Sequence, residues 1–410
     1  MNIFENFGLN QGLLNTIKNL GFTKPTQIQE QAIPHIIAGE DVIGESATGS
    51  GKTLAFGCGI VEKTIPNKGL QSLVLAPTRE LVEQVRGELL KISGKKLRII
   101  TVYGGVSINP QVSNLRTADV VVATPGRLLD HLRRGTINVS TIKLLVLDEA
   151  DRMLDMGFIE DVEKIVRQCN KQRQTLFFSA TLPPKIKRLA NNYMNNPVKV
   201  LAENMVDPSK LKQVYYDVSR DMKFSLLVHL LTQERAGLVI VFCNTRTNTD
   251  YVVKNLRVNN IDAIAIHGGF AQNKRTRTLQ SFNDAKFGVL VCTDVASRGL
   301  HIDNVSHVYN YDLPKDAKDY VHRIGRTARA GEEGKAVNIL CDLDYDNFSR
   351  ILDEYRDFKI KKEEKPEFER VKTIQVQSRR KPFTRGGRAN RPGQRRFSGG
   401  RDRFSKERRR

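Results

Sequence analysis

The sequence predicts an α/β fold with two tandem domains, each built on a parallel sheet that helices cover. Short apolar runs of strand length alternate with helix-like segments over the first 200 residues. The same alternation restarts after residues 204–210, and polar motifs directly follow most of the runs. Near-continuous apolar strands that alternate with helices are typical of parallel sheets covered on both faces. Ligands of such sheets bind beyond the carboxyl ends of the strands, where these polar motifs fall.

Length and charge fit two globular domains followed by a basic tail. The chain has 410 residues, an apolar content of 40% and a net charge of +21. Residues 371–410 hold 15 Lys/Arg and 2 Asp/Glu, a charge of +13, which leaves +8 for the other 370 residues. Most of the excess positive charge therefore lies in the tail, and it indicates a polyanionic partner.

Several classes of protein are disfavoured by simple patterns. The five cysteines are far apart and form no Cys-x-x-Cys pair, so neither a zinc site nor a disulfide framework is indicated. The first residues lack the basic and apolar regions of a secretion signal, and no apolar run approaches the about 20 residues of a membrane span. We expect a cytoplasmic monomer that does not enter a membrane.

The first forty residues predict two helices with a polar segment between them. Leu13 and Ile17 lie on one face of the first helix, which ends at Gly21, and Pro25 opens the second. Gln29 lies near the start of that second helix, and its side chain offers a donor beside an acceptor, which matches the edge of an adenine. Exposed glutamines are common, so an ordinary surface residue is the alternative.

The strands and domain boundaries follow from the apolar runs. In the first domain, residues 1–203, we expect strands at 41–44, 73–76, 98–102, 120–123, 144–147 and 175–178. In the second domain, residues 211–360, we expect strands at 237–242, 263–266 and 288–292. Residues 361–410 mix Arg, Gly, Ser and Gln, a composition that cannot bury a core, and we expect them to be disordered.

A glycine-rich segment between a strand and a helix predicts a phosphate-binding loop. Its residues are Ser46, Ala47, Thr48, Gly49, Ser50, Gly51, Lys52 and Thr53. Glycines let several backbone N–H groups point at one anion, and the helix N-terminus adds about half a positive charge. Lys52 would reach the outer phosphates, and the Thr53 hydroxyl would hold Mg²⁺. Ser46 stands where the strict pattern has glycine, and an ordinary strand–helix turn is the alternative.

Asp148 and Glu149 follow the apolar run 144–147 and supply the acidic groups that phosphoryl transfer needs. We assign Asp148 to the metal and Glu149 to the attacking water. A solvated acidic cluster is the alternative for this stretch alone. The second domain has no phosphate loop of its own, so one ATP site completed by the other domain is expected.

The segment 320–329 supplies positive charge for the γ-phosphate. If it is helical, His322, Arg326 and Arg329 fall at positions i, i+4 and i+7, on one face. Arginine fingers of this kind raise phosphoryl-transfer rates by roughly 10³–10⁵. A solvated basic helix face is the alternative.

Over residues 4–345 the motifs and their order resemble the DEAD-box ATP-dependent RNA helicases of superfamily 2, in their prokaryotic form with a basic tail. Residues 148–151 spell the tetrad that names the family. The resemblance implies two RecA-like domains, ATP and Mg²⁺ as ligands, and RNA-dependent ATP hydrolysis. It also implies local unwinding of short RNA duplexes and remodelling of RNA or RNA–protein complexes.

The resemblance also implies roles for individual residues. Phe22, Lys24 and Gln29 correspond to the adenine-reading element, and Phe4 corresponds to its upstream aromatic. Ser179, Ala180 and Thr181 correspond to the segment that links hydrolysis to unwinding. The implied RNA contacts, which suit phosphates and sugars rather than base edges, are Pro77, Thr78, Arg79, Gly104, Gly105, Thr124, Pro125, Gly126, Arg127, Thr245, Arg246, His267, Gly268, Arg275 and Thr293.

Three positions depart from the family pattern. Ser46 replaces an alanine, and Ala328 replaces a glycine between the two arginines. His301 replaces the aspartate that contacts the ATP ribose in the family. We therefore expect no ribose contact at that position, and a nucleotide affinity that is lowered or depends on pH.

The tail allows more than one function. Arg385–Arg388, with nearby Phe residues, resembles arginine-glycine RNA-binding extensions, in which a stacked ring contributes about 1–3 kcal/mol. A solubilising tail and a localisation signal are alternatives. For the whole chain, an RNA clamp or assembly scaffold and a DNA translocase of the same superfamily are the alternatives to an RNA helicase.

Overall fold

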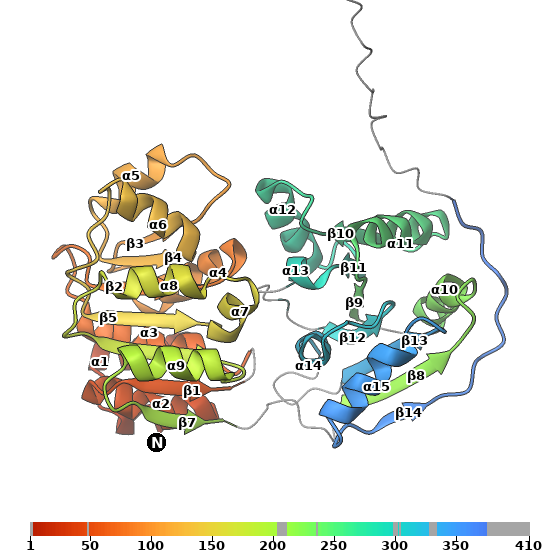
Figure 1. The fold of residues 1–410 in the computed structure, drawn as a ribbon, viewed down its shortest axis with the longest axis horizontal. Helices are drawn as coiled ribbons and strands as arrows, with labels where there is room; N and C mark the ends of the chain where they lie inside the picture. The colour runs from red at the N-terminus through yellow and green to blue at the C-terminus, as the bar shows by residue number, and fades with distance from the viewer. Residues whose placement is uncertain are drawn as a thin grey trace, which may run out of the picture. The chain divides into compact units, whose positions relative to one another are not determined.

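The computed structural model describes residues 3–46, 49–202, 211–234, 237–297, 302, 305–327 and 334–374. These residues form two seven-stranded sheets, which we call sheet A and sheet B, with helices packed on both (Figure 1). The predicted pair of α/β domains with helix-covered parallel sheets is confirmed. No helix within the described ranges has the length and apolar character that crossing a membrane requires.

Sheet A holds the first domain together and runs in the order β3-β4-β2-β5-β6-β1-β7. Each pair of neighbours is parallel, so the carboxyl ends of all its strands lie along one edge. Its strands are β1 (Val42–Glu45), β2 (Ser72–Leu75), β3 (Ile99–Val102), β4 (Val120–Ala123), β5 (Leu144–Asp148), β6 (Gln174–Ser179) and β7 (Val198–Leu201).

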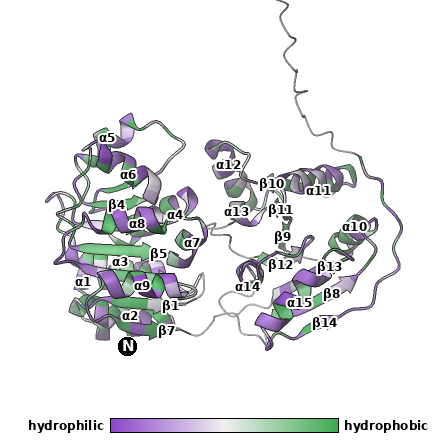
Figure 2. Cartoon of the chain, viewed as in Figure 1, coloured by the Kyte–Doolittle hydropathy of each residue, from purple (hydrophilic) through white to green (hydrophobic). Residues whose placement is uncertain are grey.

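Two hydrophobic cores cover sheet A because successive strand residues point to opposite faces. Val146 belongs to one core and Leu147 to the other, and the strands appear green in the hydropathy view (Figure 2). The surrounding helices are η1 (Ile3–Phe7), α1 (Gln11–Asn19), α2 (Gln27–Ala38), α3 (Lys52–Lys63), α4 (Arg79–Ile92), α5 (Asn109–Leu115), α6 (Pro125–Arg133), α7 (Ala150–Asp155), α8 (Ile159–Val166) and α9 (Pro184–Tyr193).

Sheet B repeats the strand order of sheet A. It runs β10-β11-β9-β12-β13-β8-β14, so in both sheets the strands stand in the order third, fourth, second, fifth, sixth, first and seventh. Its strands are β8 (Leu211–Asp217), β9 (Leu238–Phe242), β10 (Ala263–Ile266), β11 (Val289–Cys292), β12 (Val305–Asn310), β13 (Gly334–Leu340) and β14 (Ile360–Lys362). Its helices are α10 (Lys223–Gln233), α11 (Arg246–Val258), α12 (Gln272–Asn283), α13 (Asp294–Ser297), α14 (Ala317–Ile324) and α15 (Tyr345–Glu354).

All nine predicted strands are present, to within one residue at either end. Five further strands in the described residues were not predicted from apolar runs in the sequence. β12 and β13 contain His307, Asn310, Lys335 and Asn338, which break the apolar pattern. The buried amide of Asn310 donates to Asn338 (Nδ2 to Oδ1, 2.8 Å), and Asn338 in turn donates to the Val214 carbonyl at 3.0 Å. Polar groups that are hydrogen-bonded to each other in this way can be buried in a core. Because the pairing is known only from the structure, the free-energy cost of burying them cannot be judged from the sequence.

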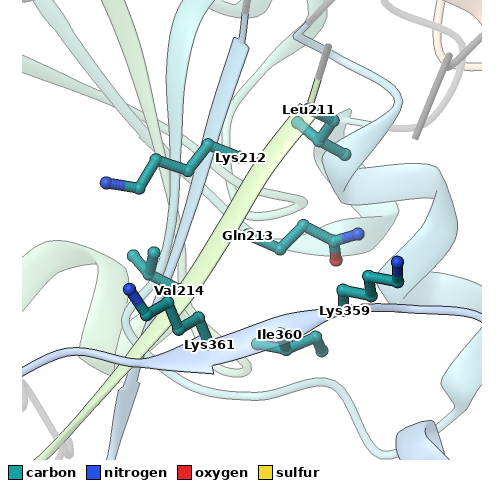
Figure 3. A pocket seen from close by; sticks show the side chains of 7 residues that line it. All are labelled: Leu211, Lys212, Gln213, Val214, Lys359, Ile360 and Lys361. Atoms are coloured by element: carbon teal, nitrogen blue, oxygen red, sulfur yellow. The ribbon is translucent and has the colours of Figure 1, made fainter. Parts of the chain in front are cut away.

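The ordered part of the second domain extends beyond residue 360, where we expected the tail to begin. β14 pairs with β8 and completes sheet B with a seventh strand, as β7 does in sheet A. A groove over these strands is lined by the lysines 212, 359 and 361 (Figure 3). Lys361 belongs to the edge strand β14, and a charged lysine on an edge strand opposes pairing with another chain. The expected linker 204–210 and residues 375–410 of the expected tail lie outside the described residues.

Residues 363–374, which we call the strap, continue from β14 across α10 and α11. Phe368 and Val371 pack against the core beneath these helices, and the Val371 amide donates to Ser225 Oγ at 3.2 Å. The buried Asn255 side chain pairs with both backbone groups of Ile374, accepting from its N–H at 2.6 Å and donating to its carbonyl at 3.2 Å. The strap is therefore part of the second domain.

Shortening the chain tests this boundary. A chain that ends at Lys359 loses β14 and the strap, and its second domain should be less stable by about 2–4 kcal/mol, because Phe368, Val371 and several backbone hydrogen bonds are removed. A chain that ends at Ile374 should unfold like the full-length protein. Chemical denaturation of the three chains measures the difference, and equal stability of both shortened chains would contradict the assignment.

Candidate functional site

The loop between β1 and α3 has the backbone of a phosphate cradle. Gly49 and Gly51 have φ values of 84° and 90°, a region that favours glycine. A Cβ atom on Gly51 would lie 2.2 Å from Gln29 Nε2, so no other residue fits there without displacing that amide. The loop begins with the Ser46 amide, which donates to the Ser179 carbonyl at 3.0 Å. Ala47 and Thr48 lie outside the described residues.

Lys52 is the first residue of α3, and Thr53 follows it. The Lys52 ammonium is buried and donates to the Ser46 carbonyl at 2.8 Å. Burial lowers the pKa of Lys52, and the negative charge of Asp148 opposes that shift. The structure therefore brings the lysine of the phosphate loop within the electrostatic reach of the acidic motif.

The start of α2 supports the phosphate loop from behind. The Thr26 hydroxyl donates to the Ser50 carbonyl at 2.7 Å, and Gln29 Nε2 donates to the Gly51 carbonyl at 3.0 Å. Gln29 Oε1 accepts from the Thr26 amide at 3.0 Å, which forms a capping box. Gln29 is only 2% exposed, so its amide bonds the loop in this structure. Sequence reasoning missed Thr26, although the Thr-x-x-Gln spacing signals the capping box.

The aromatic candidates differ in exposure. Phe4 is 0% exposed and packs edge-to-face on Phe7 in the core, with ring centroids 5.6 Å apart. Its predicted contact with a nucleotide is therefore not available in this conformation. Phe22 and Lys24 are exposed at the segment that precedes α2, where a ligand can reach them.

The acidic motif begins where β5 ends. Asp148 is buried, and its Oδ1 atom has no hydrogen-bond partner among the described residues. Burial raises the pKa of Asp148 to about 7, although the Lys52 charge opposes the rise. A buried carboxylate oxygen without a protein partner is the kind of ligand that Mg²⁺ takes beside substrate phosphates. Within the described residues no cluster of three or more His, Cys, Asp and Glu forms a metal site made by protein alone.

Glu149 is held by strained backbone and a buried ion pair. Its φ of 52° is left-handed, which is uncommon for a residue with a side chain. Its Oε2 atom accepts from Arg152 Nη1 at 2.6 Å, and both side chains are at least nine-tenths buried. Sequence reasoning missed Arg152, and the spacing of three residues to Glu149 on a helix is the signal that could have found it.

β6 pairs with β5, and hydrogen bonds join the acidic motif after β5 directly to the segment at the end of β6. Asp151 Oδ2 accepts from both the amide and the hydroxyl of Thr181, at 3.0 and 3.1 Å. Ser179 Oγ accepts from the Asp151 amide at 3.1 Å and donates to the Thr181 carbonyl at 2.7 Å. Two of the three residues predicted to couple hydrolysis to unwinding thus hold the acidic turn, while Ala180 lies between them.

The candidate RNA contacts of sheet A follow its neighbouring strands β2, β4 and β3. A Cβ atom on Gly105 would lie 1.9 Å from Arg79 Nη1, so the Arg79 guanidinium lies against this glycine turn. Arg127 donates from Nη1 and Nη2 to the Val106 carbonyl, at 3.1 and 3.2 Å. The candidates after these strands are Pro77, Thr78, Arg79, Gly104, Gly105, Thr124, Pro125, Gly126 and Arg127. The structure brings two arginines to one glycine turn.

Sheet B places its candidates after the corresponding strands. Thr245 and Arg246 follow β9, His267 and Gly268 follow β10, and Thr293 follows β11. A Cβ atom on Gly268 would lie 3.1 Å from Arg246 Nη2, so an arginine again lies over a glycine turn.

The remaining RNA candidates of sheet B have partners of their own. His267 Nε2 lies 3.1 Å from Asp250 Oδ1. Arg275, on α12, donates to the Ala296 carbonyl at 3.4 Å. These contacts orient both side chains near the carboxyl ends of β10 and β11.

The helix on which His322 and Arg326 would share a face does not extend to Arg326. α14 ends at Ile324, the N–H of its cap residue Gly325 bonds back into the helix, and Thr327 instead forms a bridge with Val305. Arg326 therefore lies beyond the helix and is 4% exposed. Arg329 and His301, at which we expect no ribose contact, lie outside the described residues.

Arg323, which sequence reasoning did not select, anchors this segment. Its Nε and Nη2 atoms form a bidentate ion pair with Asp294, at 2.6 and 2.7 Å. It also donates to Asn310, to the Asp312 carbonyl and to Asn244, at distances from 2.6 to 3.1 Å. Such a fully bonded buried arginine positions the turn that carries Arg326.

Comparison with known proteins gives this geometry a family. The family described as DEAD/DEAH box helicase matches residues 26–189, and the helicase conserved C-terminal domain matches residues 222–331. A DEAD-box ATP-dependent RNA helicase CshA of Geobacillus kaustophilus is 45% identical over 345 residues, which span 83% of this chain and 74% of the relative.

Solved structures agree. S. cerevisiae Dbp5 bound to RNA and ADP BeF3 is 31% identical, with a TM-score of 0.80 over 88% of this chain and 95% of that one. Mss116p bound to ssRNA and AMP-PNP is 29% identical, with a TM-score of 0.77 over 88% of this chain and 78% of that one. The chain thus belongs to the DEAD-box family of ATP-dependent RNA helicases, with two RecA-like domains and ATP hydrolysis as its reaction.

Proposed function

We propose that this RNA-dependent ATPase acts as a monomer that separates short RNA duplexes, with its chemistry at the end of β5. Lys52 binds the outer phosphates, and Glu149 orients and deprotonates the attacking water. Arg326 and Arg329 offset the charge that develops on the γ-phosphate. The observation that carries the proposal is the burial of Asp148 and Glu149 beside Lys52 at the same sheet edge as the glycine-rich loop.

Mg²⁺ fits this site, with Asp148 and the Thr53 hydroxyl as the protein groups that would hold it. The buried Asp148 Oδ1, which has no partner in the described part of the chain, supports this assignment. When bound, the ion polarises the phosphate oxygens. The chain itself supplies the fixed carboxylate and excludes water from it.

RNA is proposed to run along the carboxyl ends of the second, third and fourth strands of each sheet. The arginine over a glycine turn that recurs in sheets A and B supports this path. Such groups bind phosphates and sugars, so recognition is independent of sequence, and contacts to 2′-hydroxyls favour RNA over DNA.

The variant Glu149→Gln tests the hydrolytic assignment. Steady-state ATP turnover with saturating RNA should fall by roughly 10²–10⁴-fold, because the general base is removed, while a glutamine still accepts the hydrogen bond from Arg152. Glu160→Gln, an exposed acidic residue on α8, is the matched control and should turn over like the natural protein. Natural turnover in Glu149→Gln would refute the assignment.

Replacing one arginine of the proposed path tests RNA binding. Arg79→Ala should raise the RNA concentration for half-maximal ATPase stimulation by about tenfold, since it removes a charge-assisted hydrogen bond. It should also lower the slope of log affinity against log salt by about 0.7. Arg98→Ala, at the opposite end of β3, is the control. Equal effects of both variants would contradict the path.

The basic tail, which lies outside the described residues, is proposed to add nonspecific affinity for RNA. A chain that ends at Ile374 should bind single-stranded RNA with a shallower salt dependence, by about 0.7 for each phosphate that the tail neutralises. Fluorescence anisotropy with RNA at several salt concentrations measures this slope. A slope identical to that of the full chain would assign the tail to another task.

A further inference from the structure

Two buried polar side chains lie behind the glycine turn that follows β3. Gln111 on α5 is 7% exposed, and His131 on α6 is 0% exposed. α5 and α6 lie side by side near the ends of β3 and β4 (Figure 1). Neither residue touches the phosphate loop or the acidic motif in any bond described above, so neither serves the hydrolytic site.

Hydrogen bonds connect these side chains to the backbone of the glycine turn. Gln111 Nε2 lies 3.0 Å from the Tyr103 carbonyl, which only accepts, so the amide nitrogen must face it. Gln111 Oε1 therefore faces His131 Nε2, at 3.1 Å, and that nitrogen must carry the proton. His131 Nδ1 lies 2.8 Å from the Thr136 hydroxyl, which also donates to the His131 carbonyl at 3.1 Å. Donated hydrogen bonds therefore run from His131 through Gln111 to the backbone of the glycine turn.

The local electrostatics favour a neutral imidazole at His131. Burial lowers the pKa of His131, and the positive charges of Arg127 and Arg134 lower it further, while Asp130 opposes them. A neutral histidine with its proton on Nε2 donates in one direction and accepts in the other. Gln111 therefore sets the position of the proton on His131 Nε2.

This series of hydrogen bonds ends at the residues proposed to hold RNA. Tyr103 directly precedes Gly104 and Gly105, against which Arg79 lies. Gln111 Oε1 also lies 3.5 Å from Arg127 Nη1, and Arg127 donates to the Val106 carbonyl on the far side of the turn. The buried Gln111 amide therefore contacts both the glycine turn and Arg127.

We propose that Gln111 and His131 are positioning residues for RNA, which fix the Gly104–Gly105 turn and Arg127 in the arrangement that grips the backbone. This inference rests on the proposed RNA path. A buried group whose hydrogen-bond partner is removed loses more than an exposed one, because water cannot replace the partner. Release of the turn should therefore weaken RNA binding without changing the hydrolytic groups.

Two substitutions of His131 separate positioning from mere packing. His131→Leu removes the donor to Gln111, whereas His131→Gln can place its own amide nitrogen near the position of Nε2 and donate again. In His131→Leu the RNA concentration for half-maximal ATPase stimulation should rise roughly five- to tenfold, with turnover at saturating RNA within about twofold of natural. His131→Gln should restore most of the RNA affinity.

Gln111→Leu gives the same test from the other residue. Binding of a fluorescent ATP analogue and the thermal midpoint show whether each variant is folded, and any unfolded variant is replaced by its counterpart at the other position. An unchanged RNA half-saturation in a folded Leu variant, or no rescue by His131→Gln, would overturn the inference. Arg79→Ala distinguishes a failure of the proposed RNA path from a failure of the positioning role of Gln111 and His131. If it too leaves RNA binding unchanged, the path itself fails, and if it alone weakens binding, only the positioning role fails.

Discussion

Parallel hydrogen bonding between β1, β6 and β5 is the constraint on which the ATP site depends. The register places Glu45 beside Ser179, and Leu147 beside Phe177, so the three strands end close together at one edge of sheet A. The phosphate loop, the acidic motif and the segment after β6 are therefore neighbours, although about a hundred residues separate the phosphate loop from the acidic motif in the sequence. Parallel neighbours require crossover helices, which cover both faces and keep water from the strand ends. Burial in turn raises the pKa of Asp148 and lowers that of Lys52.

The two sheets show how one strand order supports different chemistry. Lys52 is the first residue of the helix after β1, and Lys223 is the first residue of the helix after β8. Lys223 is bound at 2.7 Å to the buried carboxylate of Asp344, which also accepts the amide of Cys341. That ion pair occupies a position that corresponds to the end of the phosphate loop in sheet A, and it leaves no free ammonium for a phosphate. The arginine over a glycine turn, in contrast, is kept in both sheets.

Sequence alone predicted the elements whose signal is local. Strands such as Val120–Ala123 are continuous apolar runs, and the glycines of the phosphate loop follow from the backbone that a cradle needs. The features that local sequence does not reveal concern tertiary partners. The end of α14 before Arg326 depends on Thr327 pairing with Val305, and the burial of Phe4 depends on η1 packing against α2. The hydrogen bond from Gln29 to Gly51 joins residues far apart in the sequence, so it likewise cannot be predicted until the loop is known to lie beside α2.

Coupling between hydrolysis and RNA binding, which the resemblance to the family implies, would act through the bonds that hold the acidic turn. Glu149 occupies a left-handed backbone conformation that costs on the order of 1–3 kcal/mol unless its surroundings enforce it. Arg152 on one side, and the bonds of Asp151 to Thr181 on the other, supply that enforcement. A change in the segment after β6 would therefore act on the position of the Glu149 carboxylate, to which we assign activation of the water, through the two hydrogen bonds that Asp151 Oδ2 accepts from Thr181. Since Ser179 also accepts the amide of Asp151, the turn cannot shift without breaking bonds to β6, and the response is expected to be a discrete step rather than a gradual one.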